Sequence, residues 1–349
     1  MDETKLMEFI GQFVGDLGAT VSAGNVVVGA RLGLYSELAS APGTADDLAR
    51  RTKCDPRYIA ECLRGQAAGG YVSYDAANDT YSLSDEQAFV LANPDNAVYA
   101  PGAFTLALGT LKATDRLVEA FRTGEGIGWG TQDHDVFVGC EQFFRPGYIA
   151  NLIPSWIPAL DGVEEKLQAG AKVADVGCGL GSSTILLAEH YPNAQLYGCD
   201  YHDESIELAR KRAADAGVAN RVVFETASAQ TFGGTGYDLV ATFDCLHDMG
   251  DPLGAARHIR QSIAPDGTWL IVEPMAGETV ADNLNPVGRV YYNFSAFLCV
   301  PNALSQPGGY SLGAQASEKA LGELVAQAGF SRFRRATETA FNRVYEVRP

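Results

Sequence analysis

The stretch KVADVGCGLGSSTILLAEHYPNAQLYGCD, residues 172–200, decides how the rest of this sequence is interpreted. Its apolar residues Val173, Ala174 and Val176 predict a buried strand, and the run GCGLG predicts a tight turn before a helix that opens at Ser182. Glycines let a backbone approach a ligand closely, and a helix N-terminus attracts negative charge or hydrogen-bond acceptors. The stretch therefore indicates a ligand at a strand-turn-helix unit, a signal that several kinds of nucleotide cofactor share.

Two acids narrow the choice of ligand. Asp175 lies just before the first glycine, where a carboxylate would oppose a pyrophosphate but could receive an ammonium group, directly or through water. Asp200 ends the second predicted strand about twenty residues after the turn, where an acid accepts both hydroxyls of a ribose. A ligand with a ribose diol, a cationic amino acid tail and no phosphate suits both acids, and S-adenosylmethionine is that ligand.

From residue 171 onward, short β-rich runs alternate with amphipathic helical segments, which predicts a parallel sheet covered on both faces. We expect strands near 172–176, 195–199, 221–226, 237–243 and 268–273, and helices near 182–191, 203–216, 252–263 and 317–328. At the end, FSRFRRATET and FNRVYEVRP are two strand-like runs joined by a short turn, which adds an antiparallel hairpin. The predicted fold class is α/β, with a Rossmann-like, seven-stranded, mostly parallel sheet that ends in this hairpin.

The first 95 residues predict a separate α-helical winged-helix domain. A helix is expected over about 19–40, two short helices are expected in TADDLARRT and DPRYIAECLRGQAAGG, and YVSYDAANDTYSLSD has the pattern of a hairpin. Residues 1–95 hold seven basic side chains against fourteen Asp and Glu. A surface this acidic binds duplex DNA poorly. We therefore favour a role for this domain in dimerisation or in covering the substrate.

These patterns divide the chain into a winged-helix domain over 1–95, a helical linker and cleft roof over 96–160, and a ligand-binding Rossmann-like domain over 161–349. A long insert follows the fifth strand, about residues 275–316, and contains Tyr291, Tyr292, Phe294 and Phe297. An insert at the carboxyl edge of such a sheet faces the ligand crevice. Its aromatics suggest a lid over a largely apolar substrate, although a plain core helix is the competing interpretation.

Composition excludes several classes of partner. The net charge of -17 and isoelectric point near 4.7 would repel nucleic acid and anionic lipid. The N-terminus lacks the features of a secretion signal, and we expect no apolar run approaching the roughly 20 residues that span a bilayer. The seven cysteines include no C-x-x-C pair and suit a reducing compartment, so a cytoplasmic location is expected.

Through VADVGCGLG and LYGCD, the chain resembles the class I S-adenosylmethionine-dependent methyltransferases over about residues 170–349, the C-terminal hairpin included. The winged-helix pattern in front of it further resembles small-molecule methyltransferases, among them O-methyltransferases and α-keto acid C-methyltransferases, that dimerise through such a domain. The resemblance implies S-adenosylmethionine as cofactor, a small-molecule acceptor and a homodimer formed through the N-terminal domain.

The resemblance also implies roles for particular residues. The family pattern puts four residues around the methionine part of the cofactor: Asp175, Gly177, Cys178 and Gly179. It puts Asp200 on the ribose diol, Tyr201 against the adenine face, Phe243 and Asp244 beside the sulfonium, and Tyr148 near the methionine carboxylate. Where the family has an acid reading the adenine amino group, this chain has Ser228 with Ala229, which would make a weaker contact.

His247, in the loop after the fourth strand, is the candidate catalytic residue. An unperturbed pKa of about 6.5 suits a general base, although a loop histidine that orients backbone is the alternative. His247 with Asp248 resembles part of the iron site of some α-keto acid C-methyltransferases, which needs a second, distal histidine. No histidine follows His258, so no metal is expected.

The leading hypothesis is an enzyme of secondary metabolism that transfers a methyl group from S-adenosylmethionine to a small, largely apolar acceptor by in-line displacement. The alternative from another class is a regulator that senses S-adenosylmethionine and binds DNA through the winged helix. A dinucleotide-dependent dehydrogenase is a third possibility. The choice between O-, N- and C-methylation stays open at this point.

Overall fold

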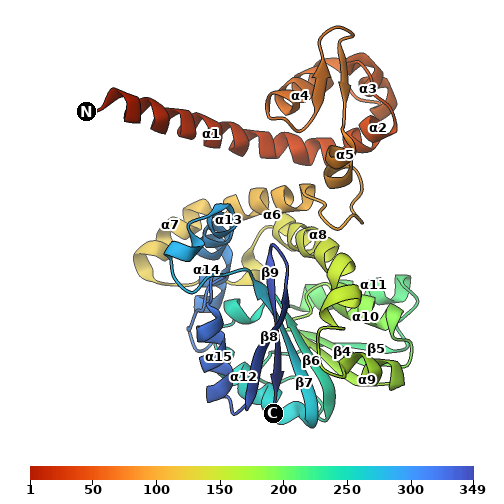
Figure 1. Cartoon of the computed structure of the whole chain (residues 1–349), viewed down its shortest axis with the longest axis vertical. Coiled ribbons are helices and arrows are strands. Elements are labelled where there is room, and N and C mark those ends of the chain that lie inside the picture. The colour runs from red at the N-terminus through yellow and green to blue at the C-terminus, as the bar shows by residue number, and fades with distance from the viewer. The chain divides into compact units, whose positions relative to one another are not determined.

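The computed structural model describes residues 1–349, which divide into two compact units (Figure 1). The first unit comprises Met1–Gly109 and His134–Gly147, and the second comprises Thr110–Asp133 and Tyr148–Pro349. Two helices contribute residues to both units, α6 (Pro101–Leu111) and α8 (His134–Asn151).

The first unit contains helices on either side of a two-stranded antiparallel hairpin. Its remaining elements are α1 (Glu3–Arg31), α2 (Leu34–Ser40), α3 (Ala45–Thr52), α4 (Pro56–Ala68), β1 (Ser73–Asp75), β2 (Thr80–Ser82) and α5 (Asp85–Leu91). Buried side chains from these helices and the hairpin form one apolar core, among them Val26, Leu34, Leu38, Leu48, Ile59, Leu63 and Tyr81. The predicted winged-helix domain is confirmed.

Local sequence explains where two of these helices begin. Thr44 and Asp47 form a reciprocal capping box at the start of α3. The carboxylate of Asp55 accepts from the first backbone N–H groups of α4, and Pro56 occupies the first turn, where its missing N–H costs no helical bond. Both helix starts follow from residues that satisfy otherwise unpaired backbone donors.

The prediction of one helix over about 19–40 is wrong at both ends. The helix begins at Glu3, where the Asp2 side chain accepts from the N–H groups of Thr4 and Lys5, and it ends at Arg31. Gly33 then takes a φ of 72°, and α2 starts as a separate helix. The left-handed backbone at this glycine, which other residues adopt at a cost, interrupts a pattern whose apolar spacing continues.

Helix α1 is long and apolar enough to cross a membrane by length and composition, with a mean hydropathy of 1.3 in its most apolar window. By this criterion, the expectation that no apolar run approaches such a length is wrong. Only 22% of the window is buried, and core helices of soluble proteins and signal sequences pass the same test. Large apolar side chains stand exposed along its N-terminal part: Leu6, Met7, Phe9, Ile10, Phe13, Val14, Leu17 and Val21.

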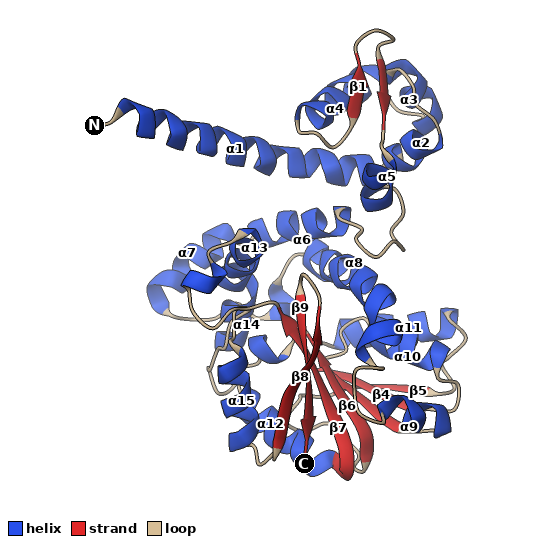
Figure 2. Ribbon diagram, in the orientation of Figure 1, coloured by secondary structure: helices blue, strands red, loops and turns tan.

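The second unit is built on a seven-stranded sheet with the order β5-β4-β3-β6-β7-β9-β8 (Figure 2). The strands are β3 (Lys172–Val176), β4 (Gln195–Asp200), β5 (Val222–Thr226), β6 (Tyr237–Phe243), β7 (Ile263–Pro274), β8 (Arg332–Glu338) and β9 (Asn342–Arg348). Strands β3 to β7 pair in parallel, whereas β9 pairs antiparallel with both β7 and β8. The predicted fold class, including the C-terminal hairpin, is confirmed.

Helices cover both faces of this sheet, as Figure 1 shows. Helices α10 (Ser182–His190) and α11 (Asp203–Asp215) contact β4 and β5, whereas α12 (Pro252–Ser262) contacts β7 and α15 (Glu318–Gln327) contacts β8. The shorter elements are α7 (Thr114–Thr123), η1 (Trp129–Thr131), η2 (Leu152–Trp156), α9 (Val163–Ala169), η3 (Leu246–Asp248), η4 (Ala281–Asn283), α13 (Pro286–Phe294), η5 (Ser295–Cys299) and α14 (Val300–Ser305). The last four lie in the insert that follows β7.

The strand order reverses at β3, because the chain passes from β3 to β4 and β5 on one side and continues with β6 and β7 on the other. In open α/β sheets, ligands bind outside the carboxyl ends of the strands at such a switch point. The ends of β3, β4, β6 and β7 are therefore where the candidate site is expected.

Candidate functional site

The glycine turn after β3 uses its own backbone donors internally. The N–H groups of Gly177 and Cys178 both donate to the carbonyl of Cys199, at 2.8 and 2.9 Å. The N–H of Gly179 donates to Oδ2 of Asp200 at 3.0 Å. These three donors therefore do not form an open nest for phosphate of the kind that nucleotide-binding loops present.

The turn needs glycine for two different reasons. Gly177 has a φ of 79°, and a Cβ built there would lie 2.7 Å from Sγ of Cys245, so the chain is packed tightly on that side. Gly179 has a φ of 50°, but a Cβ there would meet no atom within 4 Å. The turn is thus closed toward the protein at Gly177 and open at Gly179, where a ligand has room.

Asp175, at the end of β3, is completely buried. Its Oδ2 accepts from the hydroxyls of Ser183 and Thr184, each at 2.6 Å, whereas its Oδ1 has no partner. Burial raises the pKa of Asp175 to about 6, although the two hydroxyl donors oppose the rise. A buried carboxylate oxygen without a donor marks a place for a cationic or hydrogen-bonding ligand.

Asp200 ends β4 and is held by backbone donors on both oxygens. Oδ2 accepts from Gly179 N–H at 3.0 Å and Oδ1 from His202 N–H at 2.9 Å. Burial raises its pKa, while these donors oppose the shift. Each carboxylate oxygen can accept a further bond, so the fixed side chain can still receive the two hydroxyls of a diol.

The remaining residues predicted at the adenine end lie on different elements. Tyr201 follows Asp200, is 45% exposed, and its hydroxyl donates to Oδ1 of Asn302 at 2.9 Å. Ser228, after β5, shares a hydrogen bond of 2.9 Å with the hydroxyl of Thr231, and Ala229 packs against the apolar core. Their roles toward an adenine ring stay predictions.

An aromatic cluster lines the end of β6. The ring of Phe243 lies 5.4 Å from that of Tyr148 and 6.4 Å from that of Trp156, centroid to centroid. Phe243 and Tyr148 are buried. These rings form an apolar wall beside the acids described next.

Asp244 directly follows β6 with a φ of 50°, a conformation uncommon for a residue other than glycine. Its Oδ2 accepts from the Tyr148 hydroxyl at 3.2 Å, and its Oδ1 accepts from Nδ2 of Asn342 at 2.8 Å. Burial and the nearby Glu273 raise the pKa of Asp244 to about 8. Strained backbone and a raised carboxyl pKa gather at functional sites more often than elsewhere.

His247 lies in η3 and forms a buried pair with a residue that the sequence analysis missed. Its Nδ1 lies 2.5 Å from Oε2 of Glu273, and Oε1 of Glu273 accepts from Leu246 N–H at 3.0 Å. The two side chains of the pair are only 5% and 2% exposed. Burial by itself lowers the pKa of His247, but Glu273 and the thiol of Cys299 outweigh it and hold the pKa well above its ordinary value.

Three site residues were not predicted from the sequence. Glu273 is the penultimate residue of β7, and its position at the carboxyl edge was a usable signal. Asn342 and Asn302 are amides far from the motif in the chain, and only the fold brings them to Asp244 and Tyr201.

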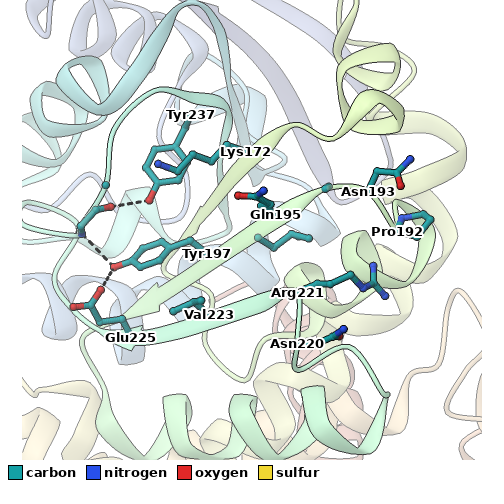
Figure 3. Close-up of a pocket in the computed structure, with 14 residues that line it drawn as sticks. Lys172, Pro192, Asn193, Gln195, Tyr197, Asn220, Arg221, Val223, Glu225 and Tyr237 are labelled. Atoms are coloured by element: carbon teal, nitrogen blue, oxygen red, sulfur yellow. Dashed lines mark hydrogen bonds between the residues drawn. The ribbon is translucent and has the colours of Figure 1, made fainter.

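A groove of about 610 Å³ lies at the amino ends of the strands, away from the residues just described (Figure 3). Two of its hydroxyl groups are hydrogen-bonded within the groove: that of Tyr197 donates to Glu225 at 2.6 Å, and that of Tyr237 donates to the carbonyl of Gly233 at 2.7 Å. Lys172 lies over the Tyr237 ring. None of the predicted site residues lines this groove.

Comparison with known families agrees with this geometry. Residues 167–327 match the family described as "Methyltransferase domain". These residues are a methyltransferase domain. Residues 20–93 match the "Rv2258c-like winged HTH domain". The domain pair confirms the resemblance to class I S-adenosylmethionine-dependent methyltransferases, and S-adenosylmethionine is the cofactor of that family.

Sequence relatives match only part of the chain. The 27-O-demethylrifamycin SV methyltransferase of Amycolatopsis mediterranei is 31% identical over 131 residues, which are 35% of this chain and 48% of that relative. The chain thus spans about half the length of the curated relatives of this kind that it matches.

Solved structures match nearly the whole chain in fold. An O-methyltransferase from Nostoc punctiforme superimposes with a TM-score of 0.72 at 20% identity, over 97% of this chain and 98% of that one. Human N-acetylserotonin methyltransferase, solved in complex with S-adenosylmethionine, superimposes with a TM-score of 0.72 at 16% identity, over 100% of this chain and 98% of that one. At these identities, the likeness shows the fold.

The residues of the methyltransferase domain fit the family's cofactor. The unpartnered Oδ1 of Asp175 can receive an ammonium group, the fixed carboxylate of Asp200 can receive a ribose diol, and the open side of Gly179 leaves room for the chain between them. The amides of Gly177, Cys178 and Gly179 are already bonded within the protein and are not free for a pyrophosphate. This arrangement suits a cofactor without phosphate better than a dinucleotide.

Proposed function

We propose that this protein transfers a methyl group from S-adenosylmethionine to a hydroxyl of a small acceptor, with His247 as the general base. The buried pair of His247 and Glu273 carries the proposal. A base is needed only where the acceptor must lose a proton, and an imidazole backed by a carboxylate is suited to taking one. The pair therefore favours an oxygen acceptor among the three kinds left open by the sequence.

The cofactor supplies a sulfonium whose methyl group is already activated for displacement. Asp175, Asp200 and Tyr201 would hold it from the β3 and β4 ends, and Phe243 and Tyr148 would keep water from the reacting atoms. With the Nδ1 proton donated to Glu273, the other ring nitrogen, Nε2, would accept the acceptor's hydroxyl proton once the thiol of Cys299, the second hydrogen-bond partner of the imidazole, has given way to the acceptor. The bound sulfonium would give up its methyl group to the deprotonated oxygen and leave as the neutral thioether, and Glu273 would stabilise the imidazolium formed on His247.

The charges around His247 bear on the kind of acceptor. Asp244 and Asp248 each lie close enough to Glu273 and to His247 for these two groups to act on their pKa values. A carboxylate or phosphate on the acceptor would meet repulsion from these carboxyl groups where they are ionised, which for Asp248 and Asp244 is above their raised pKa values of about 7 and about 8. We therefore propose an acceptor without anionic groups near its reacting hydroxyl, largely apolar, of the kind found in secondary metabolism.

The test is an assay of labelled S-adenosylmethionine with a panel of uncharged phenols and alcohols, followed by matched carboxylated analogues. We expect transfer to members of the uncharged set. His247→Ala should lower turnover roughly 100-fold or more while leaving calorimetric affinity for S-adenosylhomocysteine unchanged. His190→Ala, at an exposed histidine at the end of α10, is the matched control. Absence of S-adenosylmethionine binding would overturn the proposal, and undiminished turnover of His247→Ala would remove the base from it.

The alternative of a cofactor-sensing transcriptional regulator has less support, because the winged-helix segment is acidic and nucleic acid is not an expected partner. A gel-shift experiment at low salt with random duplex DNA checks this. Retarded DNA would favour the regulator.

We also propose that the protein is a homodimer whose copies meet through the N-terminal domain. The exposed apolar side chains of α1 are the supporting observation, since contiguous apolar patches on a protein surface commonly mark an interface. Sedimentation of the double variant Phe9→Asp, Phe13→Asp should show a monomer where the wild type shows a dimer. Flotation of the wild type with lipid vesicles would instead assign α1 to a membrane.

We keep two further expectations as proposals. The seven cysteines are all free, which suits a cytoplasmic location. The segments 1–95, 96–160 and 161–349 are proposed as the winged-helix, linker-and-roof and methyltransferase parts of the chain.

A further inference from the structure

Asn302, on α14 in the insert, joins three segments through one buried side chain. Its Oδ1 accepts from the hydroxyl of Tyr201 at 2.9 Å and from the backbone N–H of Trp129 at 3.2 Å. Its Nδ2 donates to Oδ2 of Asp248 at 3.2 Å. Asn302 is 3% exposed, whereas its partner Tyr201 is 45% exposed, so the amide itself is shielded from bulk water.

Two of the three partners adjoin residues of the proposed reaction. Tyr201 follows Asp200, the proposed ribose ligand, and Asp248 follows His247, the proposed base. Asn302 therefore links, by hydrogen bonds, the residue that follows the proposed ribose ligand to the residue that follows the proposed base. Each bond is within ordinary hydrogen-bond length.

The third partner belongs to a segment that is packed closely onto α14. Ile127 N–H donates to the carbonyl of Pro301 at 2.9 Å, and a Cβ built on Gly126 would lie 2.1 Å from the backbone nitrogen of Ser305. The segment before η1 therefore has no room to shift toward α14. The position of Trp129, and with it one acceptor bond of Asn302, is fixed by backbone contact.

The Asn302 amide satisfies all three partners, because its oxygen accepts and its nitrogen donates. The carboxyl of Asp248 is desolvated, and its pKa is raised to about 7 by burial. The charged groups that act on it come from three elements: His247 on η3, Glu273 on β7 and Asp200 on β4. A donor from Asn302 thus holds a carboxyl group whose other neighbours include two acids.

We propose that Asn302 is a positioning residue that couples occupancy of the adenosine end of the site to the placement of His247. The inference rests on the proposed function and extends it. It assigns to the insert a role in aligning the base, in addition to covering the acceptor. Asn302 itself is not expected to touch the reacting atoms.

The first arm of the test does not require methyl transfer. Adenosine is added to protein carrying 13C-labelled histidine, and the imidazole resonance of His247 is followed by NMR. Binding of adenosine should shift this resonance in the wild type. The shift should be lost in Asn302→Leu and retained in Ser305→Ala, a variant on the same helix, with calorimetry showing that adenosine still binds to each.

The second arm measures turnover against pH. Asn302→Leu should lower kcat on the order of 10- to 100-fold at every pH, as expected when a base is misplaced. In Asn302→Asp, the new carboxyl keeps the acceptor for Tyr201 but faces Asp248, and the two acids must share a proton. The ratio of Asn302→Asp to wild-type turnover should therefore rise as the pH falls, which a general loss of structure would not produce.

The outcomes separate this inference from the proposed function. A wild type whose His247 resonance is indifferent to adenosine, or an Asn302→Leu variant that keeps the shift, overturns the coupling even if methyl transfer is efficient. A coupling that behaves as expected in a protein that methylates no acceptor upholds Asn302 and overturns the proposed reaction. If Asn302→Leu does not fold, the test rests on the ratio of Asn302→Asp turnover to wild-type turnover. A ratio that does not change with pH counts against the inference.

Discussion

Replacing Glu273 by Gln tests how strongly the Glu273 carboxylate raises the pKa of His247, the candidate base. Nδ1 of His247 lies 2.5 Å from the Glu273 carboxylate, and both side chains are almost fully buried. Unit charges about 4 Å apart at an effective dielectric constant of about 20 interact by about 4 kcal/mol, which sets an upper bound of about 3 pKa units. We expect Glu273→Gln to lower the pKa of His247 by about 1 to 3 units.

The sign of the effect on rate follows from the protonation state. His247 works as a base only when Nε2 is unprotonated, so the raised pKa places the acid limb of the rate profile at higher pH. Lowering that pKa moves the limb to lower pH. On the plateau, however, turnover should fall about 10²- to 10⁴-fold, because the amide cannot accept from both Leu246 N–H and Nδ1–H and no longer stabilises the imidazolium.

The assay is an NMR titration of 13C-labelled histidine in both proteins, followed by kcat against pH with an acceptor from the panel. Calorimetry with S-adenosylhomocysteine controls for an intact cofactor site. A His247 pKa that is the same in the wild type and in Glu273→Gln would refute the reasoning, as would a plateau rate that does not change.

Three further predictions concern the cofactor end of the site. Asp200→Ala should weaken S-adenosylhomocysteine binding about 30-fold or more by calorimetry, since two charge-assisted bonds to the diol are lost at about 1.5 to 3 kcal/mol each; an affinity within threefold of wild type would contradict the assignment. Affinity for S-adenosylmethionine should fall as the pH drops through about 6, because protonation of Asp175 there removes the charge that receives the ammonium group; a flat profile between pH 5 and 8 would speak against that role. Gly181→Ala should lower thermal stability by about 2 kcal/mol or more, because its φ is 79° and the new Cβ would lie 2.7 Å from Cζ of Phe224; an unchanged melting temperature would show that the turn can relax.

Much of the fold was predictable because its signals are local. The alternation of apolar strands with amphipathic helices is a pattern of neighbouring residues, and so are the caps at Thr44 and Asp55. The bounds of α1 were less predictable. Whether the apolar spacing over 19–40 runs through Gly33 or breaks there depends on how the helix ends pack against the winged-helix core, which no local pattern records.

The residues of the site also fall into two groups, those with a local sequence signal and those without one. Asp175 and Asp200 could be found because each stands at a strand end next to a recognisable turn. Glu273 had a comparable position but no motif around it, so it was overlooked. Asn302 and Asn342 act through single hydrogen bonds to residues far away in the chain, and only the folded structure brings such pairs together.

The glycine turn has a consequence for the protein in a cell. The adenosine part of S-adenosylmethionine also occurs in ATP, ADP and AMP, so a pocket that recognises adenosine alone would be exposed to competition from all of them. Here the amides of Gly177, Cys178 and Gly179 are already bonded to Cys199 and Asp200, and the buried carboxyl group of Asp175 lies just before this turn. If the cofactor binds as proposed, these occupied amides would select against nucleotides that carry phosphates, and we expect millimolar ATP to leave cofactor affinity unaffected.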